Sequence, residues 1–123
     1  MSSLTYNLFV KAMVERRQIL CLYGGYRREV CPFMLGLNKD GEEAALTYQF
    51  AGRTSGKKGL PPGGAWKCLH LSGVSGVRLQ DGPWRGGASH STASTCLKLV
   101  DLDVNPDSPY NPKRKLCDFV SAG

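Results

Sequence analysis

The segment ILCLYGGYRREVCPFMLGL, residues 19–37, decides the fold. It opens with a short apolar run, Ile19 to Tyr23, and the Gly24-Gly25 pair that follows has the backbone freedom of a two-residue hairpin turn. A second and longer run extends from Tyr26 to Leu37. Pro32 interrupts this run and lacks a backbone donor, which predicts an edge position or a bulge there. The segment therefore predicts two antiparallel strands joined by a tight turn.

The residues before this hairpin have helical spacing. Leu4, Leu8 and Ala12 fall four apart and so share one face of a helix. Ser2 or Ser3 has the side chain that caps such a helix at its amino end. We therefore expect one amino-terminal helix that leads directly into the first strand.

Downstream of the hairpin, short apolar stretches alternate with turn-forming residues. Residues 42–51, 66–71 and 74–79 are predicted as further strands. Cys96 to Val104 alternates again and predicts an extra carboxyl-terminal strand, with a register change at Val100-Asp101. We therefore expect a mainly β domain over residues 1–104, a small SH3- or Sm-like barrel of about five strands, followed by an irregular, proline-containing tail over residues 105–123.

Composition describes a globular, basic protein. The 123 residues are 41% hydrophobic and 21% charged, and the 15 glycines suit many short strands joined by tight turns. The formal net charge of +6 favours anionic partners such as nucleic acid, phosphorylated small molecules or acidic protein surfaces, although solubility alone also explains it. No stretch approaches the roughly 18 consecutive apolar residues of a membrane span, so no membrane association is expected.

The cysteine pattern favours a reducing compartment. The five cysteines are an odd number without a repeated C-x-x-C spacing, so we expect no disulfide framework. Residues 1–10 have no basic segment followed by a long apolar run, so no secretory signal is expected. A cytoplasmic location is the simplest prediction. The cysteines are Cys21, Cys31, Cys68, Cys96 and Cys117.

Four residues stand in the order of a known family. Ala12 lies near the predicted helix end, Tyr23 closes a strand, and Arg28 then precedes Pro32. The stretch from Ala12 to Leu79 resembles the WYL domain, in which a helix ending near an alanine leads into a strand closing on tyrosine, then an arginine, then a proline that opens a further strand. The resemblance covers a little over half of the chain.

The later family motifs are only partly kept. The Trp-Tyr-Leu tripeptide aligns with residues 44–46, where only Leu46 remains. The family's Arg-x-Phe-Arg-Leu-Asp-Arg-Ile run aligns with Lys67, Leu69, His70, Leu71, Ser72, Gly73 and Val74, which keep the apolar spacing and lose most of the cations. Lys67 stands for the first arginine, His70 is a weaker substitute for the second, and Gly73 replaces the third. The chain thus resembles a divergent member of the WYL family.

The resemblance implies an Sm-like barrel that senses a ligand, often a nucleic acid or a nucleotide, in bacterial regulators and defence systems. Such proteins usually pair the barrel with a helix-turn-helix domain. Only about a dozen residues precede Ala12, so we expect a stand-alone barrel without one.

An anionic-ligand site is the leading functional hypothesis. Guanidinium groups hold phosphates in two-point geometry and tyrosines stack on bases. Strand alternation puts Arg27 and Arg28 on opposite faces, and the resemblance selects Arg28. The structural alternative is that the tyrosines are core residues and the cations solvate the surface. The predicted ligand-binding residues are Tyr23, Arg27, Arg28, Tyr48, Gln49, Arg53, Lys67 and His70.

Three other functions remain as alternatives. A protein-interaction module, with a homo-oligomer as one form of it, would use Trp66 and Trp84 as anchors. A zinc site would use Cys68 and His70 with Cys21 or Cys31. A small hydrolase would use Ser89-His90-Ser91 or Cys31 as its nucleophilic element, but no nucleophile-elbow motif surrounds them. The loop over residues 52–64 lacks the Walker spacing of a phosphate loop. We therefore expect non-catalytic ligand sensing or regulatory binding, with no cofactor, metal or catalytic residue.

Overall fold

The computed structural model describes residues 3–52, 64–86, 96–105 and 110–114. These ranges contain one α-helix, one short 3-10 helix and six strands, so the predicted mainly β class with an amino-terminal helix is confirmed. The extra carboxyl-terminal strand is also present. The elements are α1 (Leu4–Glu15), β1 (Gln18–Tyr23), β2 (Tyr26–Leu37), β3 (Glu43–Gly52), β4 (Ala65–His70), η1 (Leu71–Gly73), β5 (Val74–Gln80) and β6 (Leu99–Asp103).

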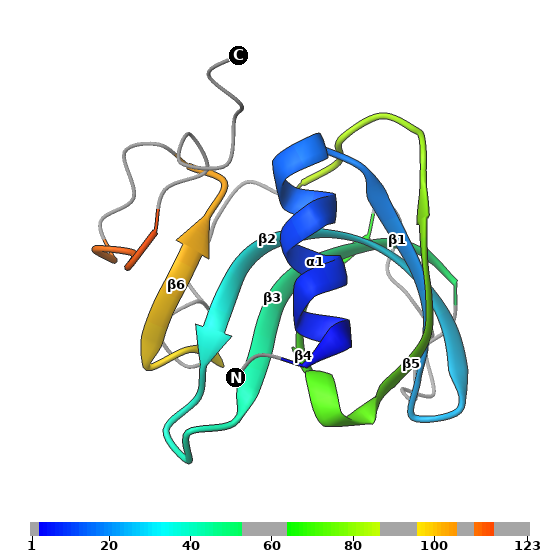
Figure 1. Ribbon diagram of the computed structural model, residues 1–123. Coiled ribbons are helices and arrows are strands. Elements are labelled where there is room, and N and C mark those ends of the chain that lie inside the picture. Colours follow the sequence, from blue (N-terminus) through cyan, green and yellow to red (C-terminus); the bar gives the residue numbers. More distant parts are fainter. Residues whose placement is uncertain (1–2, 53–63, 87–95, 106–109, 115–123) are drawn as a thin grey trace.

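All six strands belong to one antiparallel sheet. Five of them follow the order β4-β3-β2-β1-β5, and β6 pairs with β2 outside this path. The long strand β2 therefore has β3 on one side and two different neighbours on the other (Figure 1). Its first half pairs with β1 and its last residues, from Met34 to Leu37, pair with β6.

The hairpin that decides the fold has the expected register. Tyr23 pairs with Tyr26 across Gly24 and Gly25, whose φ angles of 60° and 81° lie in the left-handed region that glycine adopts without strain. The pairing of β2 with β3 shifts between Pro32 and Met34, which confirms the predicted irregularity at the proline.

The register change predicted in the last strand is also confirmed. Leu35 pairs with Leu102 and Gly36 pairs with Val100, so β6 has one extra residue, Asp101, at this point. The close approach of β6 to β2 requires glycine at position 36, because a Cβ there would lie 2.0 Å from the Leu99 carbonyl oxygen.

Helix α1 is capped at both ends, and strand β3 helps to hold the cap at its amino end. The Ser3 hydroxyl oxygen accepts from the Tyr6 amide at 3.1 Å, and Ser3 itself donates from its amide and hydroxyl to the Glu43 carboxylate of β3. Ser3 is thus the cap among the two serines predicted. Arg16 ends the helix in the left-handed region with φ 55°. In the described part of the chain, no helix has the length and the apolar character that a membrane crossing requires.

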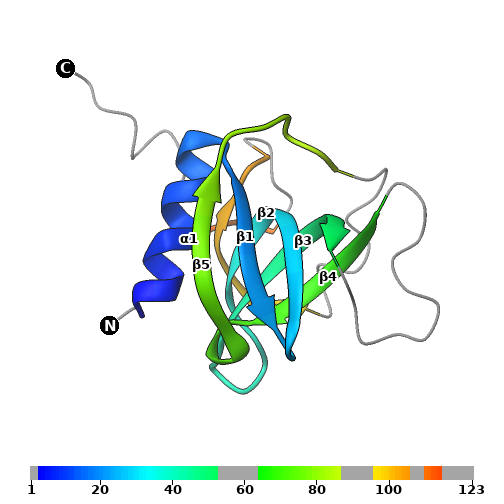
Figure 2. The ribbon, with the colours of Figure 1, turned by 90° about the vertical axis from the view of Figure 1, so that its right-hand side faces the viewer.

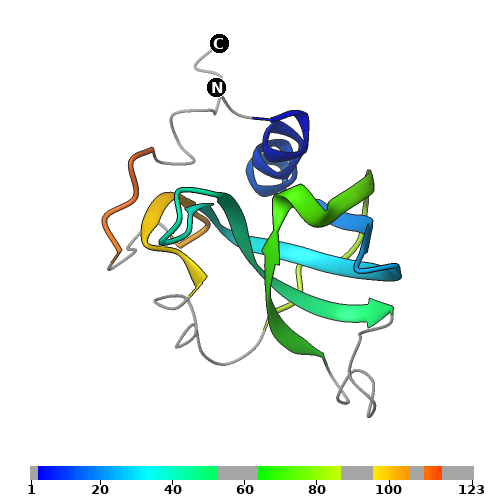
Figure 3. The same ribbon diagram turned by 90° about the horizontal axis from the view of Figure 1, so that it is seen from below.

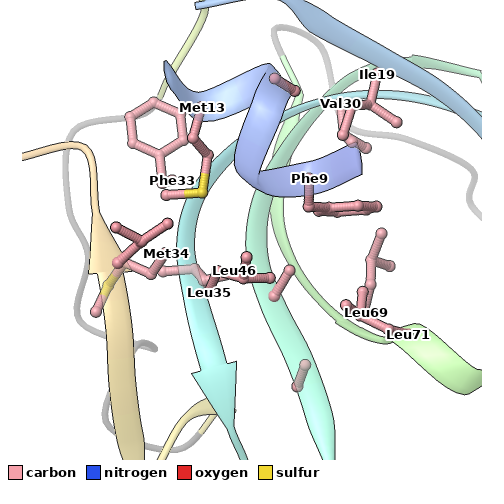
Figure 4. Close-up of a cluster of buried hydrophobic side chains, with 14 of the residues drawn as sticks. Phe9, Met13, Ile19, Val30, Phe33, Met34, Leu35, Leu46, Leu69 and Leu71 are labelled. Atoms are coloured by element: carbon pink, nitrogen blue, oxygen red, sulfur yellow. The ribbon is translucent and has the colours of Figure 1, made fainter. Parts of the chain in front are cut away.

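The core lies between α1 and the sheet. The helix contacts β1, β2 and β5. Figure 2 shows it beside β5, and Figure 3 shows it nearly end-on at one side of the sheet. Phe9 and Met13 of α1 are fully buried against side chains of the strands, among them Val30 and Leu69 (Figure 4). Burial of each such side chain contributes about 1.5–3 kcal/mol, so this helix face anchors α1 to the sheet.

The cysteines depart from the sequence-based expectation. Cys68 and Cys96 form a disulfide with a Cα separation of 5.6 Å. The expectation of no disulfide framework is therefore corrected to a single bridge, which sequence spacing could not reveal because the two residues meet only through the curvature of the sheet. Cys21 and Cys31 are buried free thiols, and Cys117 lies outside the described residues.

Candidate functional site

Arg28 lies inside the protein, opposite its neighbour Arg27. Alternation along β2 leaves Arg27 exposed, whereas Arg28 is only 5% exposed. The hairpin register places Arg28 directly across from Cys21 of β1 and across from Gly52 at the end of β3. The predicted separation of the two arginines onto opposite faces is confirmed, and Arg28 is the one that faces inward.

The Arg28 guanidinium is held by three contacts. Its Nε donates to the Tyr23 carbonyl oxygen at 3.3 Å, and its Nη1 donates to Oε1 of the fully buried Gln49 at 3.2 Å. Its Cζ lies 5.1 Å from the centroid of the Tyr23 ring, which is cation–π distance. Three of the predicted ligand-binding residues therefore form one group, the arginine cluster, defined here as Tyr23, Arg28 and Gln49.

The charge of Arg28 has no acidic partner in the described part of the chain. The ion pairs found there join Arg17 to Glu15 and Asp81, and Arg114 to Asp101. Residues 53–63, which directly follow β3, include no aspartate or glutamate. A buried cation without a carboxylate is costly, since the effective penalty of burying an ion is several kcal/mol.

A hydrogen bond from the end of strand β4 positions Tyr23. Its hydroxyl oxygen accepts from the His70 amide at 3.2 Å, so the side chain connects β1 to the last residue of β4. Gly73 in η1 leaves room for the ring, because a Cβ there would approach Cε1 of Tyr23 to 3.2 Å. His70 thus reaches the arginine cluster through its backbone, while its exposed imidazole lies 3.3 Å from Asn38.

Gly52 closes the arginine cluster at the end of β3. Its φ of 95° lies in the region that favours glycine, and a Cβ there would lie 2.4 Å from the Arg27 carbonyl oxygen and 2.8 Å from Cα of Arg28. Only glycine therefore lets β3 pass this close to Arg28.

The other predicted site residues lie elsewhere. Tyr48 occupies the opposite sheet face and its ring lies 5.1 Å from that of Trp66. The Lys67 carbonyl accepts from the Thr47 hydroxyl at 3.0 Å, and within the described ranges its ammonium makes no hydrogen bond or ion pair. Arg27 is exposed on the far face, and Arg53 lies outside the described residues.

Trp66 and Trp84, the predicted protein-binding anchors, both pack against Phe33. Phe33 lies 4.9 Å from Trp66 and 5.4 Å from Trp84, and Arg16 lies 5.4 Å above the Trp84 ring. Phe33 belongs to the hydrophobic core, the two tryptophans pack against that core, and alternation puts Trp66 with Tyr48 on the sheet face opposite Gln49. Both tryptophans remain half-buried, so part of each ring is accessible.

The disulfide removes Cys68 from the zinc site considered above, since a bonded sulfur supplies no thiolate. No group of three residues that could hold a metal ion occurs among the described residues. That correction leaves the two buried thiols. Burial raises the pKa of Cys21 to about 11 despite the Arg28 charge, and burial raises the pKa of Cys31 despite an amide hydrogen bond from Arg85. Neither thiol is activated as a nucleophile, and Ser89-His90-Ser91 lies outside the described residues.

A polar cluster that sequence reasoning missed joins α1, β6 and the chain beyond it. The Tyr6 hydroxyl and the Arg114 guanidinium both donate to the Asp101 carboxylate. Burial alone would raise the pKa of Asp101, but these hydrogen bonds and the Arg114 charge outweigh it and hold that pKa below its usual range. Burial and the bond to Asp101 raise the pKa of Tyr6. The extra residue in β6 is the only sequence signal near this cluster, and it gives no hint of the partners.

The chain stands apart in all three comparisons with known proteins. No model of a protein family matches it, no curated protein matches it, and no solved structure matches it.

Proposed function

We propose that this chain is a non-catalytic binding domain for an anionic ligand, with Arg28 as the charged anchor. The observation that carries the proposal is an arginine, only 5% exposed, without a carboxylate beside it among the described residues. A buried charge either has a partner of opposite charge or lowers the stability of the protein. An anion that enters the arginine cluster would supply the missing countercharge.

The donors of Arg28 favour an oxyanion. A guanidinium has five N–H donors, and the contacts to Tyr23 and Gln49 use two of them. The remaining donors match the two-point geometry of a phosphate or carboxylate. Because the group is buried, a terminal or free phosphate would reach it more readily than the backbone of a duplex. A nucleotide or the end of a single-stranded nucleic acid is therefore the favoured ligand class.

The arrangement of the outer strands supports the SH3- or Sm-like barrel proposed from the sequence. Strands β4 and β5 end the five-strand path, yet only the short η1 separates them along the chain. The bond from the His70 amide to the Tyr23 hydroxyl adds a second link across the same side. In such a barrel the arginine cluster would line the interior near one end, which suits a small ligand. Like the barrel, the resemblance to the WYL domain and a regulatory role in a bacterial cytoplasm remain predictions.

The test is thermal melting and calorimetry of the full chain with inorganic phosphate, nucleoside mono- and triphosphates, and short single-stranded DNA and RNA. We expect stabilisation that depends on the phosphate group and weakens as salt rises. Arg28→Met removes the charge and keeps the unbranched stem, and Arg27→Met is the matched control on the exposed face. Loss of stabilisation in R28M alone supports the site. Equal loss in both variants would reduce the effect to overall charge.

The alternative of a protein-interaction module rests on the half-buried Trp66 and Trp84. An interface built on these rings would depend little on salt, in contrast to phosphate binding. Binding to a protein partner that persists at high salt, is abolished by Trp66→Ala and is unchanged in R28M would favour this alternative.

A further inference from the structure

The Cys68–Cys96 disulfide connects one edge strand of the sheet to a segment outside the sheet. Cys68 lies on β4, beyond β3, and Cys96 lies three residues before β6, which pairs with β2. The bridge therefore joins the outer strand β4 to the segment that leads into β6. No hydrogen-bonded strand pairing in the described sheet makes this connection.

The two ends of the bridge differ in accessibility. Cys68 is exposed on β4, which has only one neighbouring strand, whereas Cys96 is 4% exposed and adjoins the buried Leu97. Exchange begins with attack of a thiolate on one sulfur of the disulfide, and access decides which sulfur is attacked. The geometry thus leaves the Cys68 end open and shields the Cys96 end.

The other described cysteines do not compete for exchange. Cys21 and Cys31 are 1% and 0% exposed, and both belong to the buried core. A thiol that is buried in this way is inert. Within the described ranges, the bridge is therefore the one place where thiol chemistry is available to a solute.

We propose that Cys68–Cys96 is a reversible thiol–disulfide exchange site, opened by a low-molecular-weight thiol that attacks the Cys68 sulfur. The attacking thiolate forms a new S–S bond to Cys68, the Cys68–Cys96 bond breaks, and Cys96 leaves as a thiolate that takes a proton from water. A second thiol then attacks the small-molecule sulfur of the mixed disulfide and releases Cys68. The protein gains two electrons, and two small thiols become one disulfide.

The bridge removes one reason for predicting a reducing compartment, because that prediction rested on the absence of a disulfide framework. Disulfides in a reducing cytoplasm are usually transient, catalytic or redox-sensing rather than permanent. Opening the bridge would release the start of β6 from β4, while Lys98 would still donate to the Leu37 carbonyl and Asp101 would still bind Tyr6 and Arg114. The reduced chain therefore keeps its fold with a looser edge.

The first experiment exposes the folded, oxidised chain to reduced glutathione, traps free thiols with N-ethylmaleimide and locates the adducts by peptide mass spectrometry. We expect adducts at Cys68 and Cys96 while Cys21 and Cys31 stay unmodified. A bridge that opens only in denaturant would be a purely structural one, and that result overturns the proposal.

A matched pair of variants tests which sulfur is attacked. In a Cys117→Ser background, Cys96→Ser leaves a free Cys68 and Cys68→Ser leaves a free Cys96, so both lack the same bridge. With oxidised glutathione we expect C96S to form its mixed disulfide at least about tenfold faster than C68S, because only Cys68 is accessible. Circular dichroism confirms that each variant is folded. Equal rates in two folded variants contradict entry at Cys68.

Discussion

Replacing Arg28 by methionine separates a residue kept for binding from one kept for stability. Methionine fills a similar volume along the same stem and removes the guanidinium. If the buried charge waits for an anion, its loss should leave the empty protein about as stable as before. If the charge instead holds the sheet together, the same substitution should destabilise it strongly.

The size of the effect follows from the contacts. The two hydrogen bonds of Arg28 measure 3.3 and 3.2 Å, at the long end of the range, so each is worth about 1.5 kcal/mol. The contact with the Tyr23 ring adds about 1 kcal/mol. Burying one ion costs several kcal/mol, and this cost offsets about as much free energy as the three contacts of Arg28 contribute. We therefore expect R28M to change the free energy of unfolding by less than about 1.5 kcal/mol in the absence of ligand.

The assay is urea unfolding followed by circular dichroism, with and without the anion that stabilises the wild type best. An anion at a hundred times its Kd should add about 2.7 kcal/mol to the wild type and nothing to R28M. The exposed R27M should shift stability by no more than about 0.5 kcal/mol and keep the response. A loss of more than about 3 kcal/mol in R28M without ligand would refute the reasoning and make Arg28 a structural residue.

Three further predictions concern the bridge, the acidic cluster and one glycine. Replacing both Cys68 and Cys96 by serine should lower the free energy of unfolding by about 3.5 kcal/mol, because the bridge closes a loop of 28 residues; urea titration of the oxidised and double-mutant chains measures it, and an unchanged midpoint would contradict it. Asp101 has a lowered pKa when folded, so its contribution is complete above its ordinary pKa of 3.8 and disappears as the pH falls through and below that value. Between about pH 6 and pH 2 the melting temperature should therefore fall less steeply in Asp101→Asn than in the wild type. Parallel curves of melting temperature against pH would argue against the cluster. Gly52→Ala should cost about 1–3 kcal/mol or more, since its Cβ would meet the Arg27 carbonyl, while Gly41→Ala, also at positive φ but with open space around it, should cost less.

Most of the secondary structure could be predicted because the signals are local. Glycine pairs, apolar runs and one proline mark the hairpin, the strands and the bulge at Pro32 without reference to distant residues. The sixth strand and its register change at Asp101 follow equally from alternation. The disulfide was missed because the approach of Cys68 to Cys96 depends on how the whole sheet curves, and no spacing rule encodes that curvature.

The candidate site divides in the same way. Alternation predicts that Arg27 and Arg28 lie on opposite faces, the resemblance selects Arg28, and its position opposite Cys21 follows from counting outward from Gly24-Gly25. The contact with Gln49 could not be predicted, because two register shifts separate β2 from a simple pairing with β3. The same shifts send Tyr48 to the aromatic face, where a sequence-based grouping with Tyr23 does not hold.

The pairing order of the strands has a consequence for folding. Strands β1 to β4 pair with their neighbours in the chain. By contrast, β5 returns to β1 with paired residues 51 (Tyr23–Val74) to 62 (Gln18–Gln80) apart, and β6 returns to β2 with paired residues 62 (Leu37–Leu99) to 69 (Met34–Asp103) apart. Closing long loops is entropically expensive, so the β1–β4 meander should form early and β5 and β6 should join late. Cys68 then meets Cys96 only when the last strand has been placed. Oxidation of this pair would therefore occur after the chain has completed its fold.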